Sequence, residues 1–263
     1  MQNLLQDKVV IVVGVGPALG RAAALACARE GAKVVLAARS EAQMAAVASE
    51  IAEIGGTALP VATDITDAGD CKRVVAKAVE AFGRLDGLVC VAYLHHDNST
   101  ITDSPDDLAN WRPLMDTNFF GTMQVVKPTI EHMRHSGGGN VVIINSLNTH
   151  SPWPRTLSYT ASKAALAAAT RSLATEYGPD NIRVNSLHAG VIFNESLYIT
   201  LDDMAQRNGT TRDEEVAKIT ALSPLRQQTK PEDYAGSVLY LLSDMSKPVT
   251  GVSLHANAGR YMG

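Results

Sequence analysis

Short apolar segments alternate with longer segments of helical periodicity along the 263 residues of the chain. The apolar segments are rich in Val, Ile and Leu throughout, which is typical of strands buried on both faces. Strands that alternate with helices form a parallel sheet covered by helices on both sides, through right-handed crossovers. Strands are expected at 9–13, 33–37, 58–61, 87–91, 140–145, 183–187 and 251–255, and helices at 18–30, 41–54, 67–82, 106–135, 157–177 and 231–243.

This pattern contains no linker, repeat or low-complexity tract, so it predicts one doubly wound α/β domain over residues 1–263, with about seven strands in a three-layer α/β/α arrangement. Only the segment 194–223 interrupts the alternation, with polar turn residues between weak helical patterns. It follows an expected strand, and ligands bind at the carboxyl ends of strands in such sheets. We therefore expect a substrate-binding lid here, with a surface helical hairpin as the alternative.

Composition excludes several classes of protein. Hydrophobic residues make up 46% of the chain, which is enough for a buried core, and the net charge of -4 leaves no basic surplus for nucleic acid. The apolar runs are far shorter than the roughly 20 residues of a membrane span, and the first residues do not resemble a secretory signal. The three cysteines, Cys27, Cys71 and Cys90, form no CxxC pair. These features predict a cytoplasmic protein without disulfides.

A glycine-rich turn lies between the first expected strand and the first expected helix. Glycines let the chain turn sharply and let its backbone approach a pyrophosphate, which the free N–H groups of a helix N-terminus bind. A tight turn without a ligand is the alternative. The position of the turn favours a dinucleotide site, formed by Gly14, Gly16, Pro17, Ala18, Leu19 and Gly20.

The end of the second expected strand bears on the choice of cofactor. An NAD site needs a carboxylate for the ribose hydroxyls, whereas an NADP site needs a cation for the 2′-phosphate. Ala38 occupies the usual acidic position, and Arg39 follows with a guanidinium suited to phosphate. Ser40 adds a hydroxyl donor. The sequence favours NADP(H), while Glu41 leaves NAD(H) as the alternative.

Candidate catalytic residues lie at the start of the helix expected over 157–177. Tyr159 and Lys163 are four residues apart, so their side chains share one face of the helix. A free phenol has a pKa of about 10, and a nearby ammonium lowers that pKa. Tyr159 thereby becomes usable as a general acid or base. Ser146, at the end of an apolar strand, is placed to hold the substrate oxygen.

Over nearly its whole length, the chain resembles the short-chain dehydrogenase/reductase family, in its short single-domain branch with a Rossmann-like fold. The family motifs match the turn at 13–20, Asp64-Ile65, Asn118, Ser146, Tyr159, Lys163 and Ala189-Gly190. The resemblance implies that Tyr159 exchanges the proton, Lys163 binds the nicotinamide ribose and lowers the tyrosine pKa, and Ser146 orients the carbonyl. It also implies that Asn118 holds a water linked to Lys163. Further cofactor contacts are expected at Asp64, Ile65, Ala92, Ile192 and Asn194.

The sequence departs from the family pattern beside the expected site. Ala18 replaces a glycine of the phosphate turn, and Tyr93 replaces a glycine beside the nicotinamide ribose. Cys90 and Val91 replace two asparagines of a backbone-bracing network. None of these changes removes a group that hydride transfer needs.

The substrate pocket is expected to be apolar and to suit a ring, with ordinary loop packing as the alternative. No metal site is predicted: His95 and His96 are adjacent and point opposite ways, and His132 and His135 lack a third ligand. The expected substrate contacts are Tyr93, His95, Leu147, His150, Trp153, Phe193 and Tyr198.

The sequence thus predicts an NADP(H)-dependent oxidoreductase acting on a secondary alcohol or ketone. The alternatives are an NAD-dependent alcohol dehydrogenase of the same family, a non-catalytic NADP-binding sensor, and reduction of an activated C=C bond. The helix over 157–177 is rich in small residues, and the family pairs this helix across a two-fold axis. A homo-oligomer, dimer or tetramer, is therefore expected, with a small-molecule substrate and no nucleic-acid or membrane partner.

Overall fold

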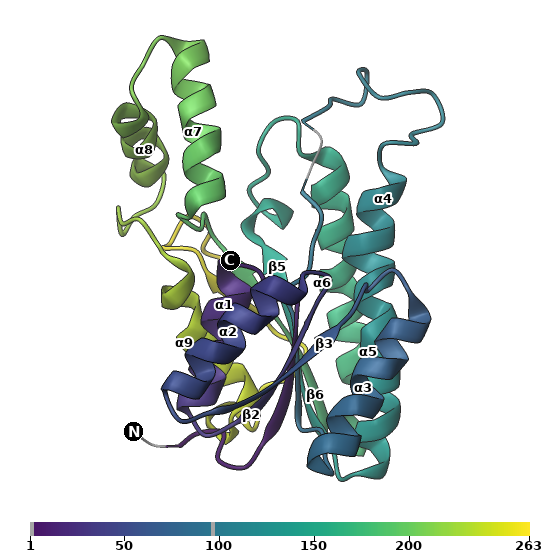
Figure 1. Cartoon of the computed structure of the whole chain (residues 1–263). Coiled ribbons are helices and arrows are strands. Elements are labelled where there is room, and N and C mark those ends of the chain that lie inside the picture. The colour runs from purple at the N-terminus through teal and green to yellow at the C-terminus, as the bar shows by residue number, and fades with distance from the viewer. Residues whose placement is uncertain (1–2, 96–97) are drawn as a thin grey trace.

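A computed structural model of the chain describes residues 3–95 and 98–263. Within them a seven-stranded sheet has the order β3-β2-β1-β4-β5-β6-β7, and all neighbouring strands are parallel. This confirms the expected doubly wound α/β fold (Figure 1). The strands are β1 (Val9–Val13), β2 (Lys33–Ala38), β3 (Thr57–Ala62), β4 (Gly87–Cys90), β5 (Gly139–Ser146), β6 (Ile182–Ala189) and β7 (Ser253–Ala256).

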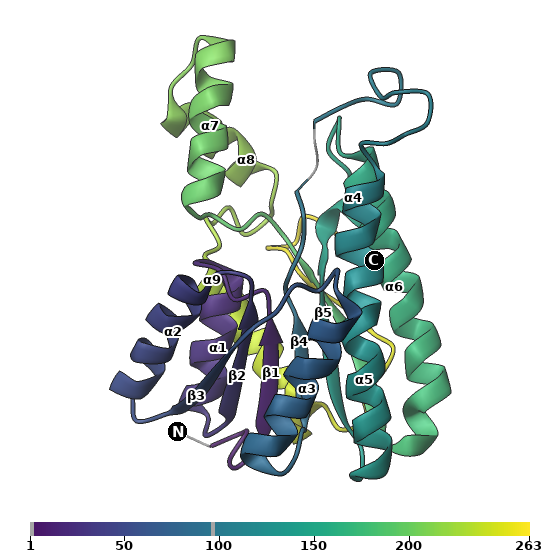
Figure 2. The same ribbon diagram turned by 45° about the vertical axis from the view of Figure 1, so that its right-hand side comes forward.

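Helices cover both faces of the sheet, as Figure 2 shows. Side chains alternate across a strand, so Val10 and Val12 of β1 pack with one set of helices and Ile11 with the other. Burial on both faces explains why the strands are apolar at every position rather than at every second one. One face carries α1 (Leu19–Arg29), α2 (Glu41–Glu53) and α9 (Pro231–Leu242), and the other carries α3 (Ala68–Phe82), α5 (Thr122–His135) and α6 (Leu157–Tyr177).

The prediction of a single helix over 106–135 was wrong in two respects: the helical region begins later, and it is not one regular α-helix. The structure has a short α4 (Arg112–Met115), then a π-helical stretch η1 (Asp116–Gly121), and only then α5. Leu108 adopts a φ of 52°, a left-handed conformation that interrupts a right-handed helix. π-Helical turns are rare and often mark functional sites, and η1 contains Asn118.

The segment 194–223 forms a helical hairpin of α7 (Glu195–Asn208) and α8 (Arg212–Ala221). Asn194 caps α7, Gly209 ends it in a left-handed conformation, and Thr211 opens α8 with a capping box. The hairpin extends beyond the carboxyl edge of the sheet (Figures 1 and 2). Its small apolar core consists of Phe193, Leu201, Val216 and Ile219.

Two further expectations concern the described residues. Cys27, Cys71 and Cys90 are buried and free, so the described chain carries no disulfide. Among the helices of residues 3–95 and 98–263, none has the length and apolar character to cross a membrane.

Candidate active site

The glycine turn brings three parts of the chain into close contact. Gly14 has a φ of 92°, and a Cβ there would lie 2.3 Å from the backbone nitrogen of Ala92 after β4. A Cβ on Gly20 would lie 2.2 Å from the carbonyl oxygen of Gly14. At Gly16, in contrast, a Cβ would meet nothing within 4 Å. The turn is therefore tightly packed on the protein side and open at Gly16, where a ligand can approach the backbone.

Helix α1, which begins directly after this turn, lacks the usual cap. Its N-cap residue Ala18 makes no side-chain hydrogen bond, and its first turn contains no acidic residue. Helices α2 and α3, by comparison, are capped by the side chains of Ser40 and Asp67. The positive end of α1 is thus left for an anion, which is the arrangement that a cofactor pyrophosphate requires.

The expected ribose end of the cofactor site carries a free cation. Arg39 is exposed and forms no hydrogen bond or ion pair with another residue of the described chain. The Asp64 carboxylate accepts hydrogen bonds from the Thr66 N–H (2.9 Å) and hydroxyl (2.7 Å), which lower its pKa, and Arg39 lowers it further. Ser40 accepts the Gln43 N–H at 3.4 Å as cap of α2, so its hydroxyl hydrogen remains available to a ligand.

Three other expected cofactor contacts are constrained by the structure. The Ile65 side chain is buried beside Gly121, so a contact to cofactor would use its main chain. Ile192 is partly buried against the core. The Oδ1 atom of Asn194 accepts the Leu197 N–H at 2.9 Å to cap α7, which leaves only its NH₂ group for a carboxamide.

Three of the four expected catalytic side chains, those of Ser146, Tyr159 and Lys163, meet at the carboxyl end of β5 and the first turns of α6. The Ser146 side chain lies close enough to the Tyr159 hydroxyl to lower its pKa. The Lys163 ammonium lies 5.8 Å from the centre of the Tyr159 ring and 5.6 Å from that of Tyr93. It donates to the carbonyl of Ile144 at 2.9 Å, while the Asn145 amide holds the Lys163 carbonyl at 3.0 Å.

Burial governs the pKa values of this group. It raises the pKa of Tyr159, and the Ser146 side chain opposes that rise. Burial also lowers the pKa of Lys163 to about 8. That Lys163 lowers the tyrosine pKa stays a prediction, because burial, Ser146 and Tyr93 are the causes of the shift in this structure. Desolvation of the phenol dominates, while the ammonium is directed to the Ile144 carbonyl.

Asn118 is fully buried and uses its whole side chain inside the protein. Its Oδ1 accepts the Leu94 N–H at 2.6 Å, and its Nδ2 donates to the Leu94 carbonyl (3.1 Å) and the Ser162 hydroxyl (3.0 Å). Ser162 in turn donates to the carbonyl of Tyr159 at 2.7 Å. The Asn118 amide is therefore a clamp between the segment after β4 and helix α6, and the expected water would have to be held by its main chain.

The expected substrate residues lie in different surroundings. Tyr93 and His95 lie beside Tyr159, with ring centres 6.3 Å and 6.2 Å from the Tyr159 ring, and Tyr93 is 51% exposed. The side chains of Leu147 and Phe193 are buried in packing positions, and their role as substrate contacts stays a prediction. Trp153 and Tyr198 are partly buried against the hairpin core, and His96 lies outside the described residues.

His150 belongs to a cluster that the sequence did not reveal. Its ring lies among His188 of β6, His255 of β7 and Tyr261 near the C-terminus, with ring centres between 4.2 and 5.5 Å from its own. The sequence contains one indication of this cluster: His188 and His255 both lie at the ends of expected strands, where side chains from different strands meet. Their alignment depends on strand register, and β6 and β7 pair His188 directly with His255.

Comparison with known proteins identifies the family of the chain. The sequence profile of a family described as enoyl-(acyl carrier protein) reductase matches residues 14–260. A protein from Aspergillus oryzae, named short chain dehydrogenase/reductase astE, is 33% identical, and the alignment covers 97% of this chain and 95% of that protein. The chain belongs to the short-chain dehydrogenase/reductase family.

Other members of the short-chain dehydrogenase/reductase family extend the comparison. The L-rhamnose 1-dehydrogenase (NAD(P)(+)) of Azotobacter vinelandii is 34% identical over 98% of both chains. The crystal structure of L-sorbose reductase from Gluconobacter frateurii, complexed with NADPH and L-sorbose, is 26% identical, with a TM-score of 0.91 over 99% of this chain and 98% of that chain. The crystal structure of NAD⁺-bound xylitol dehydrogenase has 25% sequence identity to this chain and a TM-score of 0.90, over 97% of this chain and 99% of that chain.

Membership of this family makes the protein a nicotinamide-dependent oxidoreductase that acts on small molecules bearing hydroxyl or carbonyl groups. Its relatives include proteins whose names state NAD(P)⁺, NADPH and NAD⁺, so the family alone does not decide between the two cofactors.

Proposed function

We propose that the protein interconverts a secondary alcohol and a ketone on a ring-containing small molecule, with NADP(H) as cofactor and Tyr159 as general acid or base. The observation that carries the proposal is the convergence of Tyr159, Ser146 and Lys163: the Ser146 side chain lies close enough to the Tyr159 hydroxyl to lower its pKa, and the Lys163 ammonium lies 5.8 Å from the centre of the Tyr159 ring. The bound cofactor supplies or accepts the hydride.

Each catalytic side chain has a distinct task. The Tyr159 hydroxyl gives a proton to the carbonyl oxygen during reduction and removes it during oxidation. The Ser146 hydroxyl holds the same oxygen, so that it lies within hydrogen-bonding distance of both groups. Lys163 supplies positive charge beneath the Tyr159 ring, and Asn118 keeps α6 in place through Ser162. Asn118 is thus a positioning residue.

The preference for NADP(H) rests on Arg39 and Ser40. Arg39 is an exposed cation that forms no hydrogen bond or ion pair within residues 3–95 and 98–263, and its planar guanidinium matches a phosphate. Ser40 has a hydroxyl hydrogen to donate beside it. The pyrophosphate would lie against the open backbone at Gly16 and the uncapped start of α1.

The substrate class follows from the side chains around Tyr159. The rings of Tyr93 and His95 lie beside the Tyr159 ring, which favours a substrate with a flat or ring-shaped apolar face. The ring carbons of a cyclic sugar offer such a face as well, and two relatives act on or bind sugars by name. We further propose that the hairpin of α7 and α8 serves as the lid over this site, since it stands at the carboxyl edge of the sheet (Figure 2).

Calorimetric titration with NADPH and then NADH tests the cofactor assignment without a substrate. We expect tighter binding of NADPH, and we expect Arg39→Ala to weaken NADPH by about 10- to 100-fold while changing NADH little, since a hydrogen bond to a charged group is worth about 1.5–3 kcal/mol. Arg171→Ala, at an exposed position on α6, is the control. Equal losses for both cofactors would remove Arg39 from the phosphate site and favour Glu41 and an NAD-dependent alcohol dehydrogenase.

Turnover with a panel of cyclic ketones and sugars then tests the reaction. Turnover of either with the preferred cofactor supports the proposal and identifies the substrate class. Cofactor binding without any turnover would favour an NADP-binding sensor. Reduction of an activated C=C bond, which the description of the matching family names, would appear as turnover of an enoyl thioester instead.

The assembly and location of the protein are parts of the same proposal. Small residues such as Ala164 and Ala168 are exposed on α6, where a second copy of the helix can approach closely. We propose a homo-oligomer, dimer or tetramer, which light scattering would measure. The free buried thiols Cys27, Cys71 and Cys90 fit the reducing conditions of the cytoplasm.

A further inference from the structure

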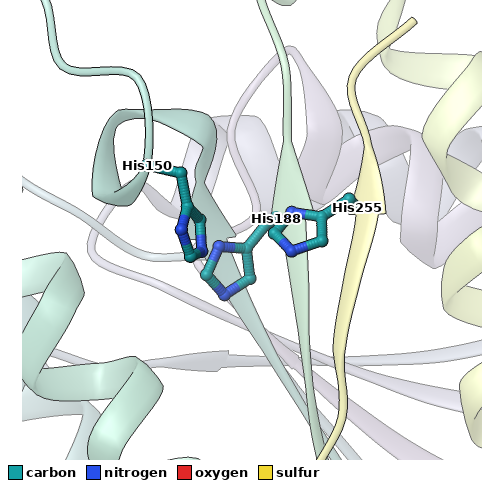
Figure 3. A group of neighbouring side chains, drawn as sticks. All are labelled: His150, His188 and His255. Carbon is teal, nitrogen blue, oxygen red and sulfur yellow. The ribbon is translucent and has the colours of Figure 1, made fainter. Parts of the chain in front are cut away.

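Three histidines from distant parts of the sequence converge at the carboxyl edge of the sheet (Figure 3). His150 follows the short helix after β5, His188 lies near the end of β6, and His255 lies beside it on β7. Each side chain offers one ring nitrogen, and the three nitrogens lie within 4.8 Å of one another. The group contains only imidazoles, with one buried ring, one partly buried ring and one exposed ring.

The orientation of His188 is fixed by its neighbour Thr149. The Thr149 hydroxyl donates to the carbonyl of Ser146 at 2.9 Å and lies 3.0 Å from Nδ1 of His188. A hydroxyl has only one hydrogen, so both hydrogen bonds are satisfied only when His188 carries its proton on Nδ1 and donates it. The remaining nitrogen, Nε2, then has a free lone pair. Such an outer hydrogen bond is how proteins set the tautomer of a metal-binding histidine.

Two ring nitrogens of the cluster are buried without a partner. Nε2 of His188 and Nδ1 of His255 make no hydrogen bond in the described chain. Leaving a buried polar atom unpaired costs about 1–3 kcal/mol, so such atoms need an explanation. Burial also lowers the pKa of both rings, which keeps them in the neutral form that binds a cation.

We propose that His150, His188 and His255 form a binding site for a late first-row divalent cation such as Zn²⁺ or Co²⁺. Imidazole nitrogen suits these ions, whereas Mg²⁺ and Ca²⁺ require oxygen ligands. Three histidines with a fourth, open position are an established ligand set for zinc.

The geometry needs only a small closure to hold the ion. Ligands at 2.0–2.1 Å in a tetrahedron are about 3.3 Å apart, so the nitrogens must approach from within 4.8 Å. His188 and His255 are held by adjacent strands, while His150 is exposed and sits after a short helical turn. A rotation of the His150 side chain therefore completes the site. Its ring now stacks on Tyr261 at 4.2 Å, which places the C-terminal segment over the cluster.

The site stands apart from the reacting groups but is connected to them. Thr149 bonds both His188 and the main chain of Ser146, so an ion here would hold the segment after β5, the edge strand β7 and the C-terminal segment together. With a water in its open fourth position, the ion would brace the turn that follows Ser146, and it takes no part in hydride or proton transfer.

Metal titration of the full chain, with any histidine tag removed, tests the proposal directly. Co²⁺ is expected to bind one ion per chain, with the visible absorption of a four-coordinate nitrogen-ligated ion, and Zn²⁺ is expected to displace it. His150→Gln and His255→Gln should each weaken binding by at least about tenfold, since even an outer partner changes metal affinity by about 10- to 100-fold. His132→Gln and His135→Gln, on α5, are the controls and should bind as the wild type does.

A second pair of variants tests the tautomer argument. Thr149→Val removes the hydroxyl and should weaken Co²⁺ binding by about 10- to 100-fold, whereas Thr149→Ser keeps the hydroxyl and the affinity. Absence of Co²⁺ binding by the wild type would overturn the proposal, and so would equal affinity of the wild type and the double variant His150→Gln/His255→Gln. If Thr149→Val bound Co²⁺ as tightly as the wild type, His188 would not be a ligand, and this result would also overturn the proposal. Because these measurements detect the ion itself, they do not depend on the proposed reaction.

Discussion

The side-chain amide of Asn118 donates to the Ser162 hydroxyl at 3.0 Å and thereby joins the π-helical turn η1 to the catalytic helix α6. Ser162 passes the constraint on, because it donates to the carbonyl of Tyr159 at 2.7 Å. The other amide contacts fix the main chain of Leu94, next to Tyr93. One buried residue therefore sets the distance between the aromatic side of the site and the catalytic tyrosine.

Asn118→Ala should lower both stability and turnover. The change removes the side-chain partner of the Leu94 main chain and one of the two hydrogen bonds of the Ser162 hydroxyl, which costs about 1–3 kcal/mol of unfolding free energy. We expect kcat to fall more than NADPH affinity, because the displaced groups lie beside Tyr159 and not beside the glycine turn. Urea unfolding and steady-state kinetics measure the two effects. Lys72→Ala, at an exposed position of α3, is the control, and an Asn118→Ala variant with wild-type kcat would contradict the positioning role.

Tyr159→Phe should abolish turnover and leave cofactor binding intact. The variant keeps the ring beside Lys163 and loses only the hydroxyl, whose pKa the Ser146 side chain lowers. General acid–base catalysis contributes about 10²- to 10⁴-fold, so kcat/KM should fall by that factor, while NADPH binding in the calorimeter stays as in the wild type. Tyr240→Phe, on α9, is the control. Turnover within tenfold of the wild type would mean that another group supplies the proton.

Lys163→Met should stabilise the protein at neutral pH while inactivating it. Burial lowers the pKa of Lys163 from 10.5 to about 8, so the unfolded chain binds more protons between these two values. The free energy of unfolding of the wild type therefore rises as the pH increases from 8 to 10.5. Below pH 8 the buried ammonium destabilises the folded state to its full extent. The pKa shift corresponds to a destabilisation of the folded wild type by about 3 kcal/mol below pH 8. Lys163→Met removes this destabilisation but also loses the hydrogen bond to Ile144, which is worth about 1 kcal/mol.

Urea unfolding at pH 7 and at pH 10 measures this effect. The advantage of Lys163→Met over the wild type should be about 2 kcal/mol at pH 7 and should largely disappear at pH 10. Lys72→Met, at an exposed position of α3, should show no such pH dependence. A variant that is less stable than the wild type at pH 7 would show that burial of the ammonium is compensated by its surroundings.

Local signals in the sequence were sufficient for the fold and for most of the catalytic group. Strands buried on both faces are apolar at every position, as β1 shows, and residues four apart on a helix share a face, as Tyr159 and Lys163 do. Properties that depend on tertiary contact were not accessible. The left-handed Leu108, the desolvation that raises the Tyr159 pKa and the pairing of His188 with His255 arise only after packing and strand register are set.

The two glycines at the start of the turn should separate folding from cofactor binding. Gly14 has a φ of 92°, and a Cβ there would lie 2.3 Å from the Ala92 backbone. Gly14→Ala should therefore strain the backbone and push apart the segments that follow β1 and β4. At Gly16 a Cβ meets nothing within 4 Å, so Gly16→Ala should fold as the wild type does. The added methyl group would stand on the open side of the turn, where the cofactor pyrophosphate is proposed to lie.

We therefore expect Gly16→Ala to keep the wild-type melting temperature and to lose NADPH affinity, whereas Gly14→Ala loses both. Differential scanning calorimetry and NADPH titration on the same preparations distinguish the two variants. Gly236→Ala is the matched control, since a Cβ at this position in α9 also meets nothing within 4 Å and lies in a regular helix. Full NADPH affinity in Gly16→Ala would place the pyrophosphate elsewhere, because a methyl group on the binding surface cannot be neutral to a phosphate held by the adjacent backbone N–H groups.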